Sequence, residues 1–133
     1  MLVVQGPVLS RLAGRLAPRT LFSLGMAGLA CAQLTFARGD ASLLFAGALL
    51  FAAGNGIAWP TFQARTADAA SEEEQGAVQG AVTSAGAVGS IAGLTLGGIA
   101  YPWLGGGLFV VAASVFVVVL LAAPALFRRP SAD

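Results

Sequence analysis

The sequence of 133 residues contains no histidine and no lysine, and its only cysteine is Cys31. A chain with one thiol cannot form an internal disulfide or a multi-cysteine metal site. Without histidine, the sequence also shows no pairing of a nucleophile with a base. We therefore expect no metal, no cofactor and no enzymatic activity. Cys31 lies in an apolar run, which indicates a small buried or lipid-facing side chain.

Charge is also scarce, because charged residues make up 10% of the chain and hydrophobic residues 57%. Soluble domains are typically about 25% charged and about 45–50% apolar. The formal net charge of +1 creates no basic field for nucleic acid. The composition therefore predicts a membrane protein whose principal partner is the lipid bilayer.

The apolar runs are continuous rather than alternating, which favours helices over a transmembrane barrel. Residues 1–12 resemble the end of a helix, so we expect the chain to be a fragment or the product of a truncated gene. We predict an all-α, polytopic helical membrane protein. Its full spans are expected at 20–37, 41–64, 75–100 and 104–126, with a polar loop at 65–74 and a turn, "YPWLGGG", at 101–107.

The basic residues are unevenly distributed among the polar segments. Six of the seven arginines lie in alternate segments, and only Arg38 lies on the opposite side. The positive-inside rule therefore places the loop at 11–19, the loop at 65–74 and the C-terminus in the cytoplasm. We expect a multi-pass protein of the bacterial inner membrane or plasma membrane.

The acidic loop ends in the sequence Ser71-Glu72-Glu73-Glu74. The spacing of Ser71 and Glu74 predicts a capping box, with the glutamates in the first helical turn. A role for these glutamates in carrying protons is the alternative interpretation, but a solvated loop favours the capping role.

Small residues recur every fourth position of the span at 75–100, which predicts close packing against another helix. This small-residue ladder consists of Ala77, Ala81, Ala85, Gly89, Gly93 and Gly97. At its start, Gln75 and Gln79 are each followed by a glycine, Gly76 or Gly80. A buried glutamine needs polar partners, so Gln79 is expected either to form an interhelical hydrogen bond or to line a cavity.

The segment "AAGNGIAWPTFQ" combines helix-breaking residues with polar and aromatic ones. Gly54, Gly56 and Pro60 predict a kink. Asn55 and Trp59 are four residues apart and share a helix face. They either line a wet cavity, or Asn55 joins helices while Trp59 marks the membrane interface.

Taken together, "GNGIAWP" and "QGAVQGAVTSAGAVGSIAG" resemble the C-terminal half of the major facilitator superfamily. The similarity is to the drug:proton antiporter branch, which includes tetracycline-efflux proteins. The tenth helix of that branch has a pattern matched by Gly54, Gly56 and Pro60. Its eleventh helix opens with a pattern matched by Gln75, Gly76, Gln79 and Gly80. The segment "SRLAGRLAPRT" is similar to the loop motif between helices eight and nine, with Arg11, Arg15 and Arg19 at its basic positions.

The resemblance implies the end of one helix plus four transmembrane helices of such a C-terminal half. It also implies export of small lipophilic compounds in exchange for protons, by alternating access. The partners would be the lipophilic substrate, protons and the N-terminal helices of the same transporter, without which the chain is not competent. Candidate residues of the substrate path are Gln5, Asn55, Trp59 and Gln79.

This sequence departs from the family pattern at two positions and lacks one expected group. Ser10 stands near the usual acidic position of the loop motif, and Leu94 replaces a proline expected midway along the eleventh helix. No carboxylate lies within a predicted span, so proton coupling cannot be assigned to any residue here. The alternative function is a small, non-transporting multipass protein that oligomerises or binds partner helices through the small-residue ladder. Upstream DNA that encodes further spans would favour the transporter.

Overall fold

The structure is a computed structural model that describes residues 16–127, in which helices are joined by short turns and no strand occurs. Its four helices are α3 (Pro18–Ala37), α4 (Ala41–Asp68), α5 (Gln75–Leu104) and α6 (Gly107–Leu126). Each is long and apolar enough to cross a membrane. The all-α fold predicted from the sequence is therefore confirmed. The predicted helix end at 1–12, Gln5, Arg11 and Arg15 lie outside the described residues.

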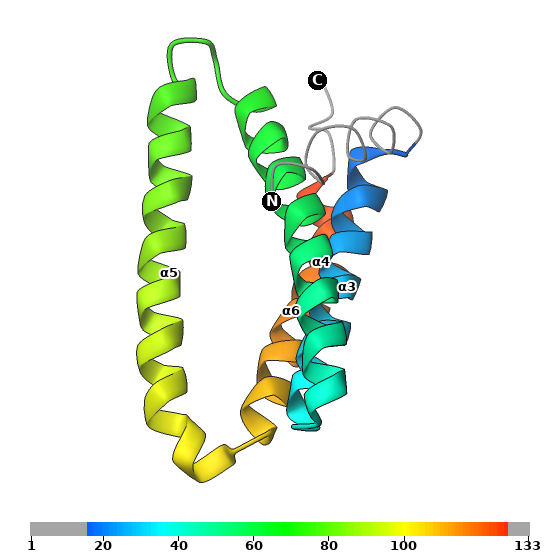
Figure 1. Ribbon diagram of the computed structural model, residues 1–133. Helices are drawn as coiled ribbons and strands as arrows, with labels where there is room; N and C mark the ends of the chain where they lie inside the picture. The colour runs from blue at the N-terminus through cyan, green and yellow to red at the C-terminus, as the bar shows by residue number, and fades with distance from the viewer. Residues whose placement is uncertain (1–15, 128–133) are drawn as a thin grey trace.

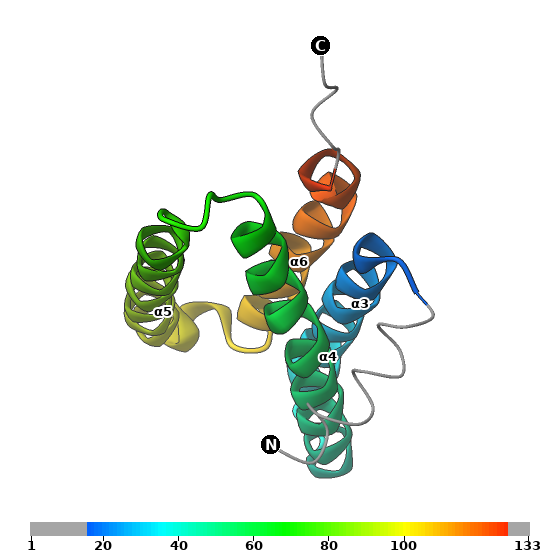
Figure 2. The ribbon, with the colours of Figure 1, turned by 90° about the horizontal axis from the view of Figure 1, so that it is seen from above.

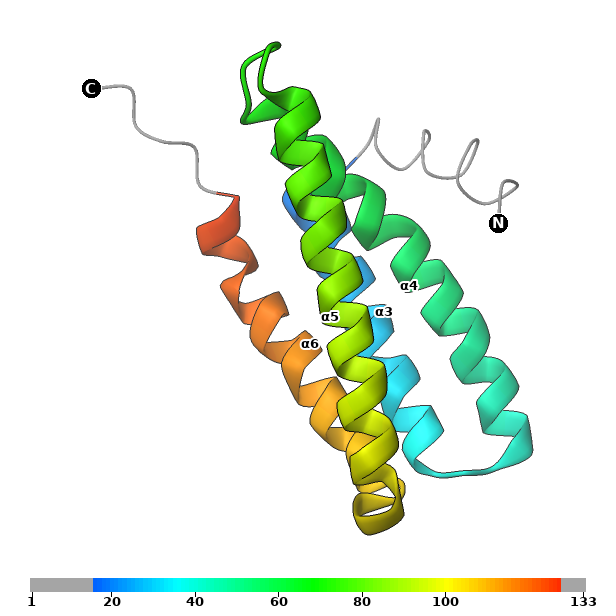
Figure 3. The same ribbon diagram turned by 90° about the vertical axis from the view of Figure 1, so that its left-hand side faces the viewer.

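The helices alternate in direction, so the start of α3 and the ends of α4 and α6 meet at one end of the bundle (Figure 1). α3 packs closely against both α4 and α6. Seen from above, α5 stands to one side of these three helices (Figure 2). Figure 3, viewed from the side of α5, shows this helix alone in front of the others.

The core lies where α3, α4 and α6 meet. Phe22 and Leu29 of α3, Ala58 of α4 and Ala123 of α6 are its buried members. The rings of Phe22 and Phe127 pack at a centroid distance of 5.3 Å, which is favourable for tilted aromatic pairs. No residue of α5 is buried within the described part of the chain.

Local sequence explains where several helices begin. Pro18 stands at the start of α3, where its fixed φ suits a helix and its missing N–H costs nothing. Asp40 caps α4, because its carboxylate accepts a hydrogen bond from the backbone N–H of Ser42 at 2.9 Å. Gly39, with φ of 69°, allows the tight turn before this cap.

Helix α4 continues to Asp68, one turn past the predicted end at residue 64. The charged Arg65 marks a change in polarity, but it does not break the helix. The hydroxyl of Thr66 also bonds back to the carbonyl oxygen of Gln63 at 2.9 Å within the same turn. A change in polarity therefore does not mark the end of this helix.

The turn predicted at 101–107 is much shorter in the structure. Tyr101, Pro102 and Trp103 are helical, and α5 ends only at Leu104. Gly105 supplies the positive φ, 50°, at which the chain turns. Pro102 has no N–H to donate to the carbonyl oxygen of Gly98, yet the helix continues for two more residues, to Leu104. The predicted turn therefore began four residues too early.

The predicted capping box is also different in the structure. α5 begins at Gln75, after the three glutamates, and none of them lies in its first turn. The Ser71 hydroxyl donates to the Glu74 carboxylate at 2.8 Å. These two side chains therefore bond to each other instead of capping backbone N–H groups.

Pro60 lies inside α4, which remains one continuous helix. The Thr61 hydroxyl donates to the carbonyl oxygen of Ile57 at 2.7 Å, a bond of the kind that bends helices. Figure 1 shows α4 leaning toward α5 over its final turns. Gly54 has a packing role that the sequence did not predict, because it lies against α3.

Candidate functional site

The candidate site is a cavity of about 280 Å³ between α3, α4 and α6. Helix α4 provides Asn55 and Trp59, whose spacing of four residues places them on one face. The structure therefore brings together two of the residues singled out from the sequence. The remainder of the lining is apolar: Phe22, Met26, Leu29, Ala58, Phe62 and Phe116.

Aromatic rings form much of the cavity wall. The ring of Phe62 lies 6.4 Å from that of Phe22 and 6.2 Å from that of Trp59, between centroids. Phe116 adds a ring from α6. Asn55 is half-buried and is the only lining residue with an amide side chain. Such a wall offers a ligand broad apolar contact and one group that can donate or accept hydrogen bonds.

Helix α5 does not line the cavity, but it comes close to one residue of the cavity wall, Trp59. A Cβ atom built on Gly86 would lie 3.4 Å from Cη2 of Trp59. The absence of a side chain at Gly86 therefore lets α5 approach the indole. Trp59 remains 40% exposed despite this contact.

Gln79 holds the start of α5 against α4. Its side-chain amide donates a hydrogen bond of 3.2 Å to the backbone carbonyl oxygen of Gln63. The interhelical hydrogen bond, one of the two sequence interpretations of Gln79, is therefore observed. Gln79 is not part of the cavity wall, and Gln75 is exposed.

The small-residue ladder does not pack against α4 in the described part of the chain. Gly89 and Gly93 have no neighbouring atom within 4 Å of the position where a Cβ would stand, and the same holds for Gly76 and Gly80 at the start of the helix. Gly97 lies near the side chain of Leu108 in α6. Ala85 and the rest of this face are open, so a packing role for the ladder requires helices beyond these four.

The cavity wall carries no charge, and no group of three or more potential metal ligands occurs within residues 16–127. Arg19, the one described arginine of the loop motif, is exposed at the start of α3. Asp40 lies outside the spans, where hydrogen bonds from the Ser42 hydroxyl and from backbone N–H groups hold its pKa below the ordinary value of 3.8.

Sequence reasoning missed most of the apolar wall. Phe22, Met26, Phe62 and Phe116 carry no signal that separates a cavity lining from an ordinary core. Gly86 was missed because it falls outside the four-residue period of the small-residue ladder. Only contacts between helices reveal these roles.

Four apolar helices of alternating direction, three of which enclose an uncharged, aromatic cavity, define a multipass α-helical membrane protein. The family model described as Major Facilitator Superfamily matches residues 1–133. The chain belongs to this family of membrane transporters. A search of curated proteins and a search of solved structures each found no match.

Proposed function

We propose that this transporter exports small lipophilic compounds, which bind in the cavity beside Asn55 and Trp59. The cavity is the observation that carries the proposal. Its volume of about 280 Å³ lies near the lower end of ligand pockets, roughly 300–1,000 Å³. Trp59 would supply much of the contact area for a lipophilic ligand. Asn55 would orient that ligand with a hydrogen bond.

We also propose that export is coupled to protons by alternating access, as in the drug:proton antiporter branch. The support is the sequence resemblance at the tenth and eleventh helices of that branch. In the described residues, the carboxylates of Asp40, Asp68 and Glu72 to Glu74 lie at helix ends or in a loop. A proton-carrying group within the membrane would therefore come from helices other than α3 to α6.

In this proposal, transport requires further helices besides the four described. Helix α5 is 30 residues long and has no buried residue. Transporters of this kind work by the movement of two halves against each other. The chain would thus form part of the C-terminal half and work only together with the N-terminal helices of the same transporter.

Efflux assays in a bacterial strain that lacks its own pumps would test this function. The chain would be expressed alone and together with the N-terminal helices, and the accumulation of several lipophilic dyes would be measured. Only the complete transporter should lower accumulation. Robust efflux by the 133-residue chain alone would contradict the proposal.

The site is tested by two variants of the complete transporter. Trp59→Ala should change which dyes are exported, because it removes an aromatic wall. Asn55→Ala should weaken transport by about two- to twelvefold, the equivalent of a hydrogen bond of about 0.5–1.5 kcal/mol. Trp103→Ala is the matched control, since Trp103 is 87% exposed and lies outside the cavity. Unchanged dye profiles for both cavity variants would refute the site.

A second candidate function is a small membrane protein that does not transport and that oligomerises through α5. The open face of α5 favours it. Stable self-association of the chain in detergent, with no efflux in any combination of helices, would support this alternative.

A further inference from the structure

A second hollow lies at the end of the bundle where α3 begins and α4 ends. It consists of two neighbouring cavities, of about 310 and 270 Å³, that both include Pro18, Arg65 and Asp68 in their walls. We call these two cavities together the arginine groove. Asn55 and Trp59 do not line it, so it is separate from the candidate substrate cavity.

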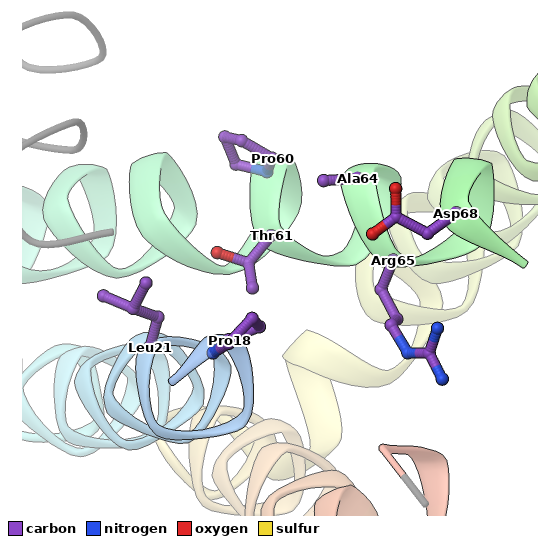
Figure 4. A pocket seen from close by; sticks show the side chains of 7 residues that line it. All are labelled: Pro18, Leu21, Pro60, Thr61, Ala64, Arg65 and Asp68. Carbon is purple, nitrogen blue, oxygen red and sulfur yellow. The ribbon is translucent and has the colours of Figure 1, made fainter. Parts of the chain in front are cut away.

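The inner part of the arginine groove is apolar. Leu21 of α3 and Pro60 and Ala64 of α4 form its sides (Figure 4). Thr61 also lines it, but its hydroxyl already donates to the carbonyl oxygen of Ile57. This part of the groove therefore suits hydrocarbon better than a polar ligand.

The outer part of the groove is charged. Arg19 comes from the first turn of α3, and Arg65 and Asp68 come from the last turns of α4. In Figure 4 the Arg65 guanidinium and the Asp68 carboxylate extend away from each other. The guanidinium is therefore not directed at this carboxylate.

These features lie where a membrane-spanning bundle meets water. α3 and α4 are both candidate spans, so their shared end is at the level of lipid headgroups. Basic pockets between transmembrane helices bind acidic headgroups, and guanidinium groups match phosphate oxygens in geometry and charge. Among the described residues, the two arginines and the one aspartate of the lining sum to one net positive charge, which complements a single phosphodiester.

We propose that the arginine groove binds one molecule of an anionic phospholipid with a single phosphate, such as phosphatidylglycerol. Arg19 and Arg65 bind the phosphate. The start of an acyl chain lies against Leu21, Pro60 and Ala64. Asp68 disfavours headgroups that carry more negative charge.

The opposite end of the bundle provides an internal comparison. A cavity of about 290 Å³ there is lined by Leu34, Thr35, Arg38 and Leu43. It has one arginine where the arginine groove has two. Arg38 is exposed, so replacing it removes a positive charge without touching the arginine groove.

Native mass spectrometry of the purified 133-residue chain in detergent would test the proposal. Dioleoyl phosphatidylglycerol would be titrated against dioleoyl phosphatidylcholine, which has the same acyl chains and no net charge. Phosphatidylglycerol should bind more tightly, with one molecule retained. Arg19→Gln and Arg65→Gln should each weaken its binding about fivefold, the effect expected of one arginine near a membrane surface. Arg38→Gln should leave it unchanged, and Asp68→Asn should strengthen it.

Three results would overturn the proposal. The first is equal binding of the two lipids. The second is an equal loss of phosphatidylglycerol affinity in Arg38→Gln and Arg65→Gln. The third is that glycerol-1-phosphate displaces bound phosphatidylglycerol as effectively as the intact lipid does. The last result would mean that the apolar part of the groove contributes nothing. Circular dichroism would verify that each variant stays helical. If Arg65→Gln lowers the helix content, the test depends on Arg19→Gln. Arg19 is exposed, so its replacement should leave the helices intact.

Discussion

Gly25 of α3 and Gly54 of α4 bring two helix backbones into direct contact. A Cβ atom on Gly54 would lie 2.8 Å from the carbonyl oxygen of Gly25 and 3.0 Å from the backbone nitrogen of Leu29. A Cβ on Gly25 would lie 2.9 Å from the carbonyl oxygen of Gly54. Small residues that let helix backbones approach are a main source of association in membranes. In the described bundle this role belongs to the α3–α4 pair.

Gly54→Ala should therefore destabilise the bundle by about 1–3 kcal/mol, because the added methyl group meets backbone that cannot move aside. Unfolding in mixed micelles with increasing sodium dodecyl sulfate would measure the change. Gly56→Ala is the matched control, since Gly56 is in the same helix and has no atom within 4 Å of its Cβ position. The control should be neutral or slightly stabilising. Equal losses for the two variants would contradict the proposed contact.

Gln79→Ala should loosen the start of α5, because it removes the hydrogen bond to the carbonyl oxygen of Gln63. Interhelical hydrogen bonds of this kind contribute about 0.6 kcal/mol on average in membranes, with a maximum of about 1.7 kcal/mol. Hydrogen exchange of amides near residue 79 should accelerate. Gln75→Ala provides the comparison, because Gln75 is exposed. Equal rates of amide exchange near residue 79 in the two variants would contradict this role of Gln79.

The sequence was sufficient to predict the four spans and the pairing of Asn55 with Trp59 on one face. Both predictions depend on local properties. One is the length of the runs without charged residues, and the other is the four-residue spacing that places two side chains on the same helix face. Pro102 and the glutamate run were misread for a related reason. A proline near a helix end and charges beside a helix are compatible with more than one boundary.

Contacts between distant segments were beyond the reach of sequence patterns. Gly54 was interpreted as part of a kink, although it packs against Gly25. Nothing in the spacing of Gly25 distinguishes it from the open glycines of α5. The aromatic wall of the cavity could not be predicted for the same reason, since Phe22 and Phe116 come from helices remote in sequence. Which small or aromatic residues meet is decided by helix packing, which a single sequence does not specify.

The cap of α4 should depend on pH. In the folded protein the pKa of Asp40 lies below its ordinary value of 3.8, owing first to the hydrogen bond from the Ser42 hydroxyl. A lowered carboxylate pKa means that the stabilisation is present above 3.8 and is lost as the pH falls through the folded value. Carboxyl-carbon NMR in micelles would follow the titration. Ser42→Ala should raise the pKa of Asp40, whereas Ser84→Ala should not. An identical Asp40 pKa in both variants would exclude the Ser42 contribution.

We predict that the loop after α4 faces the cytoplasm, because six of the seven arginines lie in the alternate segments on that side. Ala69→Cys and Gly107→Cys lie at opposite ends of the bundle and would be made in a Cys31→Ser background. A membrane-impermeant maleimide should label position 107 in intact cells and position 69 only after permeabilisation. Gly106 is unsuitable for labelling because a side chain there would meet the carbonyl oxygen of Ala37. Labelling of both positions from one side would refute the topology.

The effect of enlarging Gly93 should depend on whether other helices are present. No atom of the described chain lies within 4 Å of the Cβ position of Gly93, so Gly93→Leu should leave the isolated chain as stable as before. In the complete transporter the same change should overfill a close helix contact, at a cost of about 1–3 kcal/mol. Thermal stability in detergent would be measured for the chain alone and with the N-terminal helices. Val117→Leu is the control, because Val117 is 42% exposed on α6 and an added methylene there costs little. A loss of stability that appears only for Gly93→Leu, and only in the complete transporter, would place the small-residue ladder against the other helices. Equal behaviour of Gly93→Leu in both settings would mean that α5 faces lipid along this ladder.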